Sequence, residues 1–347
     1  MWCKKCNRGT VKDFCEFCGS STESDAPHEI FWCAICNVPL IKSAKDIDRM
    51  ICSLCGKVTT YLCADLRPVF PEERLFYEII HGNPLAHIND SVWASDNRYY
   101  INGNSKPVTN AFYKKVSPKE IQAQLEKYNG QNGYEQFNAI IERFIRANEN
   151  RLVEIVDEAH EFIVDSAKGY KKKDIVISFS GGKDSTIIAD LVVRALRDPC
   201  LVHVYGDTTL EFPMTYEYAA RFRNDNPRAI FKVARNNEQD FYLVCNDIGP
   251  PARMLRWCCF MFKTGPIARV LNRLYGEKDI LTFYGIRKCE SVSRSRYNRI
   301  ENDAESIKIQ KQKVASPIFF WKDIDVWLYI LGDKKAAYAA LKPKANS

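Results

Sequence analysis

A strand, a glycine-rich turn and a helix follow one another in residues 174–196, and this order constrains the fold more than any other feature. The apolar strand Asp174–Ser178 leads through Phe179-Ser-Gly-Gly-Lys-Asp-Ser-Thr186 into the amphipathic run Ile187–Leu196. Such a junction turns backbone N–H groups and the positive end of a helix toward one point, where a phosphate can bind. The segment therefore predicts a nucleotide phosphate site, although a glycine turn after a strand is common by itself.

The residue types of this turn suit an anion. Gly181 and Gly182 allow positive φ and the close approach of a phosphate, the serine hydroxyls donate hydrogen bonds, and Lys183 adds a positive charge. The Walker A spacing is absent, so this is a different phosphate loop. The residues predicted to bind the nucleotide here are Ser178, Ser180, Gly181, Gly182, Lys183, Asp184, Ser185 and Thr186.

Strand-like and helical patterns alternate from Lys171 onward. The strand-like runs are Ile175–Phe179, Leu201–Tyr205, Ala229–Val233 and Ile280–Ile286. This alternation predicts an α/β fold, a Rossmann-like, doubly wound and mainly parallel sheet with its ligand at the carboxyl ends of the strands. Asp207 and Thr208 directly follow the second strand, so we predict contacts to ribose, metal or phosphate; a helix cap is the alternative.

Cysteine spacing predicts metal sites at the start of the chain. Eight of the 14 cysteines form four C-x-x-C pairs, and two such pairs complete one tetrahedral Cys₄ zinc site. We therefore predict two zinc ions, with sequential ligation as the simplest pairing and crossed ligation left open. A redox C-x-x-C would sit at a strand–helix junction, which these pairs do not. The predicted ligands are Cys3, Cys6, Cys15, Cys18, Cys33, Cys36, Cys52 and Cys55.

These patterns divide the chain into four expected parts. They are the zinc ribbons (residues 1–66), a small mixed β module or connector (67–133), a helical connector (134–170) and the nucleotide domain (171–347). Two short strand-like runs, Ser91–Ser95 and Arg98–Gly103 with its Asn-Gly turn, identify the β module, which is either an RNA-binding element or a plain connection. Apolar residues at helical spacing between 134 and 168 predict one or two long helices.

The composition leaves several partners open. A formal net charge of +7 suits a nucleotide, a sulfate-bearing metabolite or a nucleic acid. No apolar run approaches the roughly 20 residues of a membrane span, and the first residues lack a signal-peptide pattern. We expect a cytoplasmic protein without a membrane partner.

Two later segments carry reactive or basic groups. The run Arg256-Trp-Cys-Cys-Phe-Met-Phe-Lys263 presents Cys258 and Cys259 as thiolate ligands or nucleophiles, and its flanking cations are expected to lower the cysteine pKa values. Two buried free cysteines are the alternative. Arg287 and Arg294 follow the last strand-like run, where guanidinium groups can bind sulfate or phosphate bidentately unless the loop is only a solvated basic surface.

Together these segments resemble the PP-loop adenine-nucleotide α-hydrolase superfamily, and within it the phosphoadenylyl sulfate (PAPS) and adenylyl sulfate (APS) reductase family. The resemblance covers roughly residues 171–331 and implies an oxidoreductase of sulfur metabolism that binds PAPS or APS, with an electron or sulfur donor protein as partner. The motifs are Ser180–Ser185, Asp207-Thr208 with Phe212-Pro213, Cys258-Cys259, Gly285-Ile-Arg287 with Arg294, and Ser316–Trp321 with Asp325–Trp327. The catalytic residues that it implies are Lys183, Asp184, Cys258, Cys259, Arg287 and Arg294.

The chain also departs from the reductase pattern. Family reductases usually end with a cysteine that attacks the sulfate sulfur, and cluster-bearing members add a later C-x-x-C, whereas no cysteine follows Cys289 here. A [4Fe–4S] cluster on Cys258 and Cys259 therefore needs ligands from elsewhere. Either the chain is a truncated family member, or a partner chain in an oligomer supplies the ligands, or the chemistry differs.

Two alternatives stay open beside the reductase. An ATP pyrophosphatase of the same superfamily would bind ATP and Mg²⁺, adenylate a nucleic acid or a metabolite, and pass sulfur to it from a cysteine at 258 or 259. A non-catalytic nucleotide-binding subunit would carry out neither reaction. The products formed from ATP, APS and PAPS separate the three.

Overall fold

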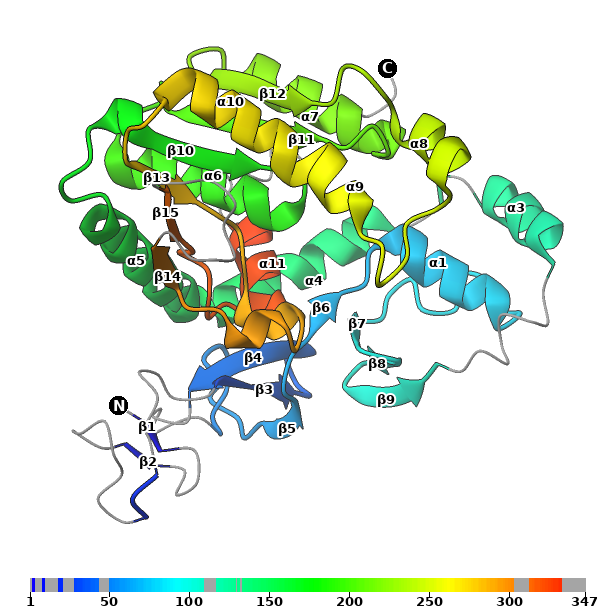
Figure 1. Cartoon of the computed structure of the whole chain (residues 1–347). Helices are drawn as coiled ribbons and strands as arrows, with labels where there is room; N and C mark the ends of the chain where they lie inside the picture. Colours follow the sequence, from blue (N-terminus) through cyan, green and yellow to red (C-terminus); the bar gives the residue numbers. More distant parts are fainter. Residues whose placement is uncertain are drawn as a thin grey trace. The chain divides into compact units, whose positions relative to one another are not determined.

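A computed structural model of the chain describes residues 2–3, 8–9, 18–20, 28–43, 50–108, 117–128, 130–131, 133–302 and 312–332. The chain divides into two compact units (Figure 1). Unit 1 comprises residues 1–152 and 322–332, and unit 2 comprises residues 153–321 and 333–347.

Unit 2 is built on a six-stranded sheet with the strand order β12-β11-β10-β13-β15-β14. Five strands are parallel and the edge strand β14 is antiparallel to β15. This confirms the predicted α/β class with a mainly parallel sheet. The strands are β10 (Ile175–Phe179), β11 (Val202–Asp207), β12 (Ile230–Arg235), β13 (Ile280–Phe283), β14 (Ile300–Asn302) and β15 (Gln312–Ala315).

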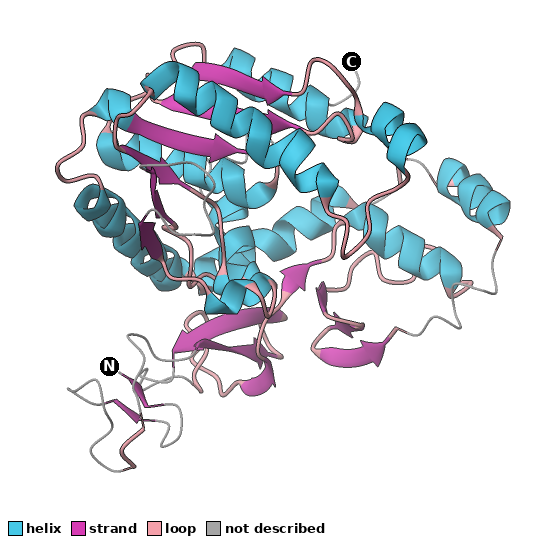
Figure 2. Cartoon of the chain, viewed as in Figure 1, coloured by secondary structure: helices cyan, strands magenta, loops and turns pink. Residues whose placement is uncertain are grey.

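Helices lie on both faces of this sheet (Figure 2). Both faces are therefore dry, which explains why β10 is a nearly continuous apolar run rather than an alternating one. The hydrophobic core of unit 2 includes Val176, Val202, Val204 and Leu271, all nearly inaccessible to solvent. The helices are α5 (Glu149–Ser166), which begins in unit 1, α6 (Lys183–Leu196), α7 (Pro213–Asp225), α8 (Phe241–Ile248), α9 (Trp257–Cys259) and α10 (Gly265–Tyr275).

The strand order reverses at β10. The chain runs outward from β10 through β11 to β12, and then returns to the other side of β10 to form β13 and β15. In open parallel sheets such a reversal separates the loops that follow two neighbouring strands, and ligands bind in that crevice. The segments that leave β10 and β13 therefore define the expected ligand edge of unit 2.

Unit 1 holds two small antiparallel sheets and a strand pair. One sheet has the order β4-β3-β5, the other has the order β6-β7-β8-β9, and β1 pairs with β2. The strands are β1 (Trp2–Cys3), β2 (Arg8–Gly9), β3 (His28–Cys33), β4 (Val38–Ser43), β5 (Thr60–Cys63), β6 (Arg67–Pro68), β7 (Val92–Ser95), β8 (Arg98–Ile101) and β9 (Asn104–Pro107). The predicted Asn-Gly turn joins β8 and β9, with positive φ at both residues.

The helices of unit 1 come from distant parts of the sequence. They are α1 (Pro71–Ile80), α3 (Pro118–Lys127), α4 (Tyr134–Ala147) and α11 (Asp323–Gly332). The last of these follows the whole of the parallel sheet in sequence, yet it packs against α4 and β6. Its side chains are apolar around most of the helix, so it can only be stable when enclosed. Within the described residues, none of the helices has both the length and the apolar character required to cross a membrane.

Candidate functional site

The turn between β10 and α6 adopts the geometry expected of an anion-binding loop. We call residues Ser180–Ser185 the glycine loop. Gly181 has φ +76°, a region that favours glycine, and a Cβ there would come within 3.1 Å of the Thr215 methyl group. Gly182 is the N-cap of α6. The positive end of the α6 dipole therefore opens at this loop, at the carboxyl edge of the sheet.

Hydroxyl groups fix the shape of the glycine loop. The Ser180 backbone N–H donates to Ser185 Oγ at 3.1 Å, and Ser185 Oγ donates to the Gly182 carbonyl at 2.9 Å. Thr186 Oγ1 donates to the same carbonyl at 3.0 Å and lies 2.9 Å from the Tyr218 hydroxyl. Ser185 and Thr186 are buried. These two side chains therefore hold the loop from within, while Ser178 lies in β10 and hydrogen-bonds to the Tyr284 hydroxyl.

A loop from β13 reaches the first turn of α6. Arg287 Nε donates to Asp184 Oδ1 at 2.8 Å, and Lys183 Nζ lies 3.4 Å from Asp184 Oδ2. A Cβ on Gly285 would lie only 2.8 Å from the Asp184 carbonyl carbon. The predicted strand Ile280–Ile286 ends at Phe283 instead, because the chain leaves the sheet to make this approach. Sequence reasoning missed the contact, and its only signal was the glycine in Tyr284-Gly-Ile-Arg287.

Asp207 and Thr208 organise the loop after β11. Asp207 is 4% exposed, and its carboxylate accepts hydrogen bonds from the Thr209 backbone N–H, the Tyr216 hydroxyl and the Arg235 guanidinium. Thr208 Oγ1 donates to Glu211 at 2.7 Å. The side chains of Asp207 and Thr208 therefore shape the loop after β11. The alternative of a helix cap fits these contacts less well.

Cys258 and Cys259 lie in a distorted helix. The two cysteines end α9, and a π-helical turn, Phe260–Thr264, follows before α10. Burial raises the pKa of Cys258 and the adjacent Cys259 raises it further, so the expected lowering is wrong for Cys258. Arg256 does act in the expected direction, and it donates to Cys259 Sγ at 3.4 Å, but the effect of burial on Cys258 is larger. Arg294, the remaining predicted residue, is partly exposed and forms an ion pair with Glu290.

Four cysteines converge in unit 1. The Sγ atoms of Cys33, Cys36, Cys52 and Cys55 all lie within 4.8 Å of one another. Cys33 and Cys55 are 3.5 Å apart and Cys36 and Cys52 are 3.8 Å apart, close to the roughly 3.8 Å edge of a tetrahedron with Zn–S bonds of about 2.3 Å. Among the described residues, this is the group in which three or more potential metal ligands meet. Cys258 and Cys259 gain no third ligand of this kind there.

Both C-x-x-C turns of the cluster have the same backbone form. Each is followed by a residue with positive φ, Asn37 (57°) and Gly56 (67°), and the Cys36 backbone N–H donates to Cys33 Sγ at 3.4 Å. Burial raises the pKa of Cys36, whereas the Lys57 backbone N–H lowers the pKa of Cys55 to about 7. A bound cation would therefore find at least one thiol that ionises near neutral pH.

The other predicted cysteine set lies almost entirely outside the described residues. The side chains of Cys3, Cys6 and Cys15 are not described, so the first predicted zinc site is not tested. Cys18 is described, and Gly19 after it has φ +66°, nearly the value of Gly56.

Side-chain hydrogen bonds connect the cluster to the rest of unit 1. Asn102, in the β8–β9 turn, accepts from Asn37 Nδ2 at 2.8 Å and from the Ser91 N–H at 2.9 Å, and donates to Asp90 at 2.8 Å. Ser53 Oγ donates to the Ala147 carbonyl at the end of α4. The four cysteines are therefore part of the packed unit rather than of a free module.

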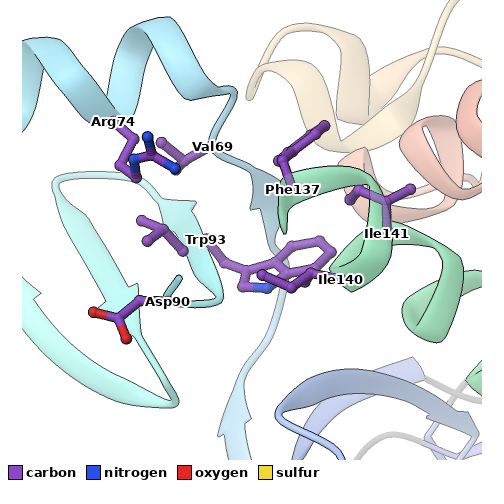
Figure 3. Close-up of a pocket in the computed structure, with 8 residues that line it drawn as sticks. Val69, Arg74, Asp90, Trp93, Phe137, Ile140 and Ile141 are labelled. Atoms are coloured by element: carbon purple, nitrogen blue, oxygen red, sulfur yellow. The ribbon is translucent and has the colours of Figure 1, made fainter. Parts of the chain in front are cut away.

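A small cavity lies elsewhere in unit 1, between β7, α1 and α4 (Figure 3). Its volume of about 10 Å³ is close to the space of one water molecule. Arg74 and Asp90 supply polar groups among apolar side chains that include Trp93 and Ile140. It is too small for a nucleotide.

Comparisons with known proteins agree with this description. Residues 174–342 match the model of the phosphoadenosine phosphosulfate reductase domain. An uncharacterized protein of Methanocaldococcus jannaschii is 33% identical over 219 residues, which cover 63% of this chain and 44% of that protein. The chain thus spans less than half the length of this curated relative.

Two solved structures to which the chain is similar have low sequence identity and low TM-scores. The PAPS reductase of Candida auris, in a phosphate complex, is 14% identical with a TM-score of 0.38, covering 53% of this chain and 85% of that chain. The FMN adenylyltransferase of Candida glabrata, in complex with ATP, is 12% identical with a TM-score of 0.40, covering 51% and 54%.

The fold and the glycine loop at its switch point define a PP-loop type of α/β domain. More narrowly, residues 174–342 match the model of the phosphoadenosine phosphosulfate reductase domain, in agreement with the resemblance of the sequence motifs.

Proposed function

We propose that the chain is an enzyme of sulfur metabolism that binds an adenylyl sulfate-type nucleotide on the glycine loop and reduces or transfers its sulfur group. One observation carries the proposal. The strand, the Gly181-Gly182 turn and the α6 N-terminus form an anion-binding geometry at the strand-order reversal of the sheet. They do so inside the segment that matches the reductase domain.

The residues have distinct proposed roles. Backbone N–H groups at Gly181 and Gly182 and the Lys183 ammonium group bind phosphate oxygens, while Ser185 and Thr186 hold the loop. Arg294, partly exposed on the β13 side, stands at the sulfate end. The remaining proposed contacts around the nucleotide come from Ser178, Ser180, Asp207 and Thr208.

In the reductase reaction, the sulfur–oxygen bond to the nucleotide breaks and two electrons reach the sulfuryl group, giving sulfite and AMP from APS, or sulfite and adenosine 3′,5′-bisphosphate from PAPS. The electrons come from a dithiol or a donor protein, which is oxidised. Cys258 and Cys259 are the candidate entry point for these electrons.

One observation favours the alternative of an ATP pyrophosphatase. In the described part of the chain, Cys258 and Cys259 gain no further cysteine, histidine or carboxylate ligand within reach of a shared metal. This chain's described residues would then supply an incomplete [4Fe–4S] site, whereas a sulfur carrier needs only one cysteine. ATP would transfer its adenylyl group to a metabolite or nucleic acid and release pyrophosphate with Mg²⁺, and the incoming sulfur would then displace AMP from that acceptor.

Product analysis tests these functions. The purified chain is incubated separately with APS, PAPS and ATP plus Mg²⁺, in the presence of a dithiol reductant, and sulfite, AMP, adenosine 3′,5′-bisphosphate and pyrophosphate are measured. Sulfite above the level of a Gly182→Val control supports the reductase. Pyrophosphate from ATP without sulfite from APS or PAPS supports the alternative. Nucleotide binding without any product would leave a non-catalytic subunit, and absent binding would overturn the whole proposal.

We also propose that Cys33, Cys36, Cys52 and Cys55 bind one zinc ion with a structural role. The sulfur–sulfur distances suit tetrahedral Zn²⁺, and four thiolates leave no open position for a substrate. Elemental analysis of the purified chain should give two zinc ions if the other predicted set also binds, and one if it does not. Less than about one zinc per chain would contradict this site, with iron measured separately as a control.

A further inference from the structure

We propose that Gly285 and Arg287 are positioning residues. Both hold the first turn of α6, and Arg287 also neutralises the Asp184 carboxylate, so that the glycine loop can accept a phosphate. This inference rests on the proposed binding of an adenine nucleotide. It assigns Arg287 a role different from the sulfate contact expected from the sequence.

The steric evidence concerns Gly285. A Cβ at this position would lie 2.8 Å from the Asp184 carbonyl carbon, 2.9 Å from its oxygen and 3.0 Å from the Ser185 nitrogen. All three are backbone atoms, so they cannot move aside as a flexible side chain would. The loop after β13 can therefore rest against α6 only because residue 285 lacks a side chain.

The electrostatic evidence concerns Asp184. A carboxylate in the first turn of a helix is favourable for the helix dipole, but it repels a phosphate that binds at the same end. Arg287 compensates this charge with Nε at 2.8 Å from Oδ1, and Lys183 does so at 3.4 Å from Oδ2. Without Arg287, the phosphate would approach the Asp184 carboxylate while Lys183 alone compensates its negative charge.

The burial of Arg287 separates it from a freely exposed sulfate ligand. Its side chain is only 4% exposed, and Nη1 donates to Cys289 Sγ at 3.4 Å. Its backbone N–H donates to Glu290 at 3.1 Å. Arg294, by contrast, is 38% exposed, which leaves it better placed to approach a substrate.

The ends of the same loop are also fixed within unit 2. The Tyr284 N–H donates to the Ala315 carbonyl and the Lys288 N–H donates to the Phe319 carbonyl. With Gly285 and Arg287 bound to the first turn of α6, the loop has three points of attachment. The glycine loop and the segment that carries Arg294 are thus held in one geometry.

Calorimetry on four forms of the full chain tests this role. The wild type, Arg287→Ala, Arg287→Ala with Asp184→Asn, and the exposed loop control Arg296→Ala are titrated with AMP, ATP and APS. We expect Arg287→Ala to weaken all three nucleotides by about tenfold. Asp184→Asn removes the uncompensated charge, so the double variant should regain most of that loss, and the control should match the wild type.

Two outcomes would overturn the positioning role. A loss confined to APS would make Arg287 a direct sulfate ligand, and a double variant as weak as or weaker than Arg287→Ala would contradict charge neutralisation. Gly285→Ala serves as a second variant, with the same expected loss for all three nucleotides. Unfolding curves for each variant show whether a loss of binding reflects a loss of folded protein.

A second measurement separates this inference from the proposed function. If the wild type binds none of the nucleotides, the proposed function fails, and hydrogen exchange in the ligand-free protein still tests the contact. Residues 183–186 should exchange faster in Arg287→Ala and Gly285→Ala than in the wild type or in Arg296→Ala. Unchanged exchange in both variants would show that neither residue positions this turn.

Discussion

Each unit contains an aspartate in the first turn of a helix that pairs with an arginine far away in the sequence, and the two pairs differ in burial. In unit 1, Arg151 donates to both oxygens of Asp325, at 2.9 and 3.2 Å, and Asp325 is fully buried. In unit 2, Arg287 contacts Asp184 through one 2.8 Å bond, and the Asp184 side chain is 16% exposed. The first pair is enclosed and bidentate, and the second stands beside an open loop.

The difference in burial between the two aspartates determines what each ion pair can do. A fully buried charge must keep its partner, because removing one member leaves an unpaired ion in a low dielectric. His28, at the start of β3, also contacts Arg151 at 2.9 Å, which ties the pair to the sheet of the cysteine cluster. A pair whose aspartate keeps some solvent contact beside a loop can instead modulate an incoming charge. Breaking the ion pair of unit 1 should therefore lower folding stability, and breaking that of unit 2 should lower nucleotide affinity.

The largest expected effect is that of metal removal on unit 1. Structural zinc contributes on the order of 10 kcal/mol to small domains, and here the cluster is hydrogen-bonded to α4 and to the β8–β9 turn. Chelation should therefore increase hydrogen exchange in β3, β4 and α4, and not only in the C-x-x-C turns. Cys52→Ser should act in the same way, with the exposed Cys200→Ser as control. Unchanged exchange in α4 after confirmed metal loss would show that the cluster is an independent module.

Breaking the buried pair should have the next largest effect. Arg151→Ala leaves Asp325 buried without its main partner, so we expect a loss of about 3–5 kcal/mol in the free energy of unfolding. Arg287→Ala should cost clearly less, because Asp184 keeps Lys183 and some solvent contact. Urea unfolding measures both. Equal losses for the two variants would contradict the distinction drawn from burial.

Acid should destabilise unit 1 through protonation of the buried Asp325 carboxylate. Burial alone would raise the pKa of Asp325, but Arg151 and its hydrogen bonds lower the pKa below the ordinary value of 3.8. A carboxyl group with a lowered folded-state pKa stabilises the fold above its unfolded pKa, and that contribution is lost as the pH falls through the folded value. Unit 1 should therefore lose stability below about pH 3.8, and Asp325→Asn should remove this component. An unchanged acid transition in that variant would assign the loss to other carboxyl groups.

Binding should respond to the glycine loop while stability does not. Lys183→Ala removes one charge-assisted contact, for which we expect about 1.5–3 kcal/mol of nucleotide affinity. Gly182→Val places a branched side chain where the phosphate approaches the backbone. Calorimetry with AMP and ATP measures the loss, and urea unfolding checks the fold. Unchanged affinity in both variants would make the loop structural.

The two regions also differ in how much of them the sequence could predict. The ligands of the cluster are fixed by local spacing, since two C-x-x-C turns need only meet, and the four cysteines do converge. The glycine loop was equally local. Gly285 lies 100 residues from Ser185 in sequence, and its contact with α6 depends on β13 lying next to β10, which no periodicity reveals.

Short or enclosed elements escaped prediction for related reasons. Strands β14 and β15 have three and four residues, too few to show an alternating pattern, and they are recognisable only through their pairing. Helix α11 lies within the segment that matches the reductase domain model, and its contacts are with unit 1. Its aspartate at 325 was part of the family motif, and the motif gave no indication that Arg151 would be its partner.

The smallest expected effect concerns the link between the cluster and the β8–β9 turn. Asn102→Gly keeps a residue that tolerates the observed φ of 50° and removes only the side-chain bonds to Asn37, Ser91 and Asp90. Because these bonds are partly exposed and water can replace them, we expect a loss of about 1 kcal/mol in unfolding free energy. Metal affinity should fall with it, since Asn37 follows the ligand Cys36. Lys106→Gly, at an exposed position of β9, is the control. If stability falls and zinc affinity in a competition assay does not, Asn102 supports the hairpin alone. If both fall together, the turn and the metal ligands form one cooperative structure, and the enclosure that distinguishes the Asp325 pair extends to the metal cluster.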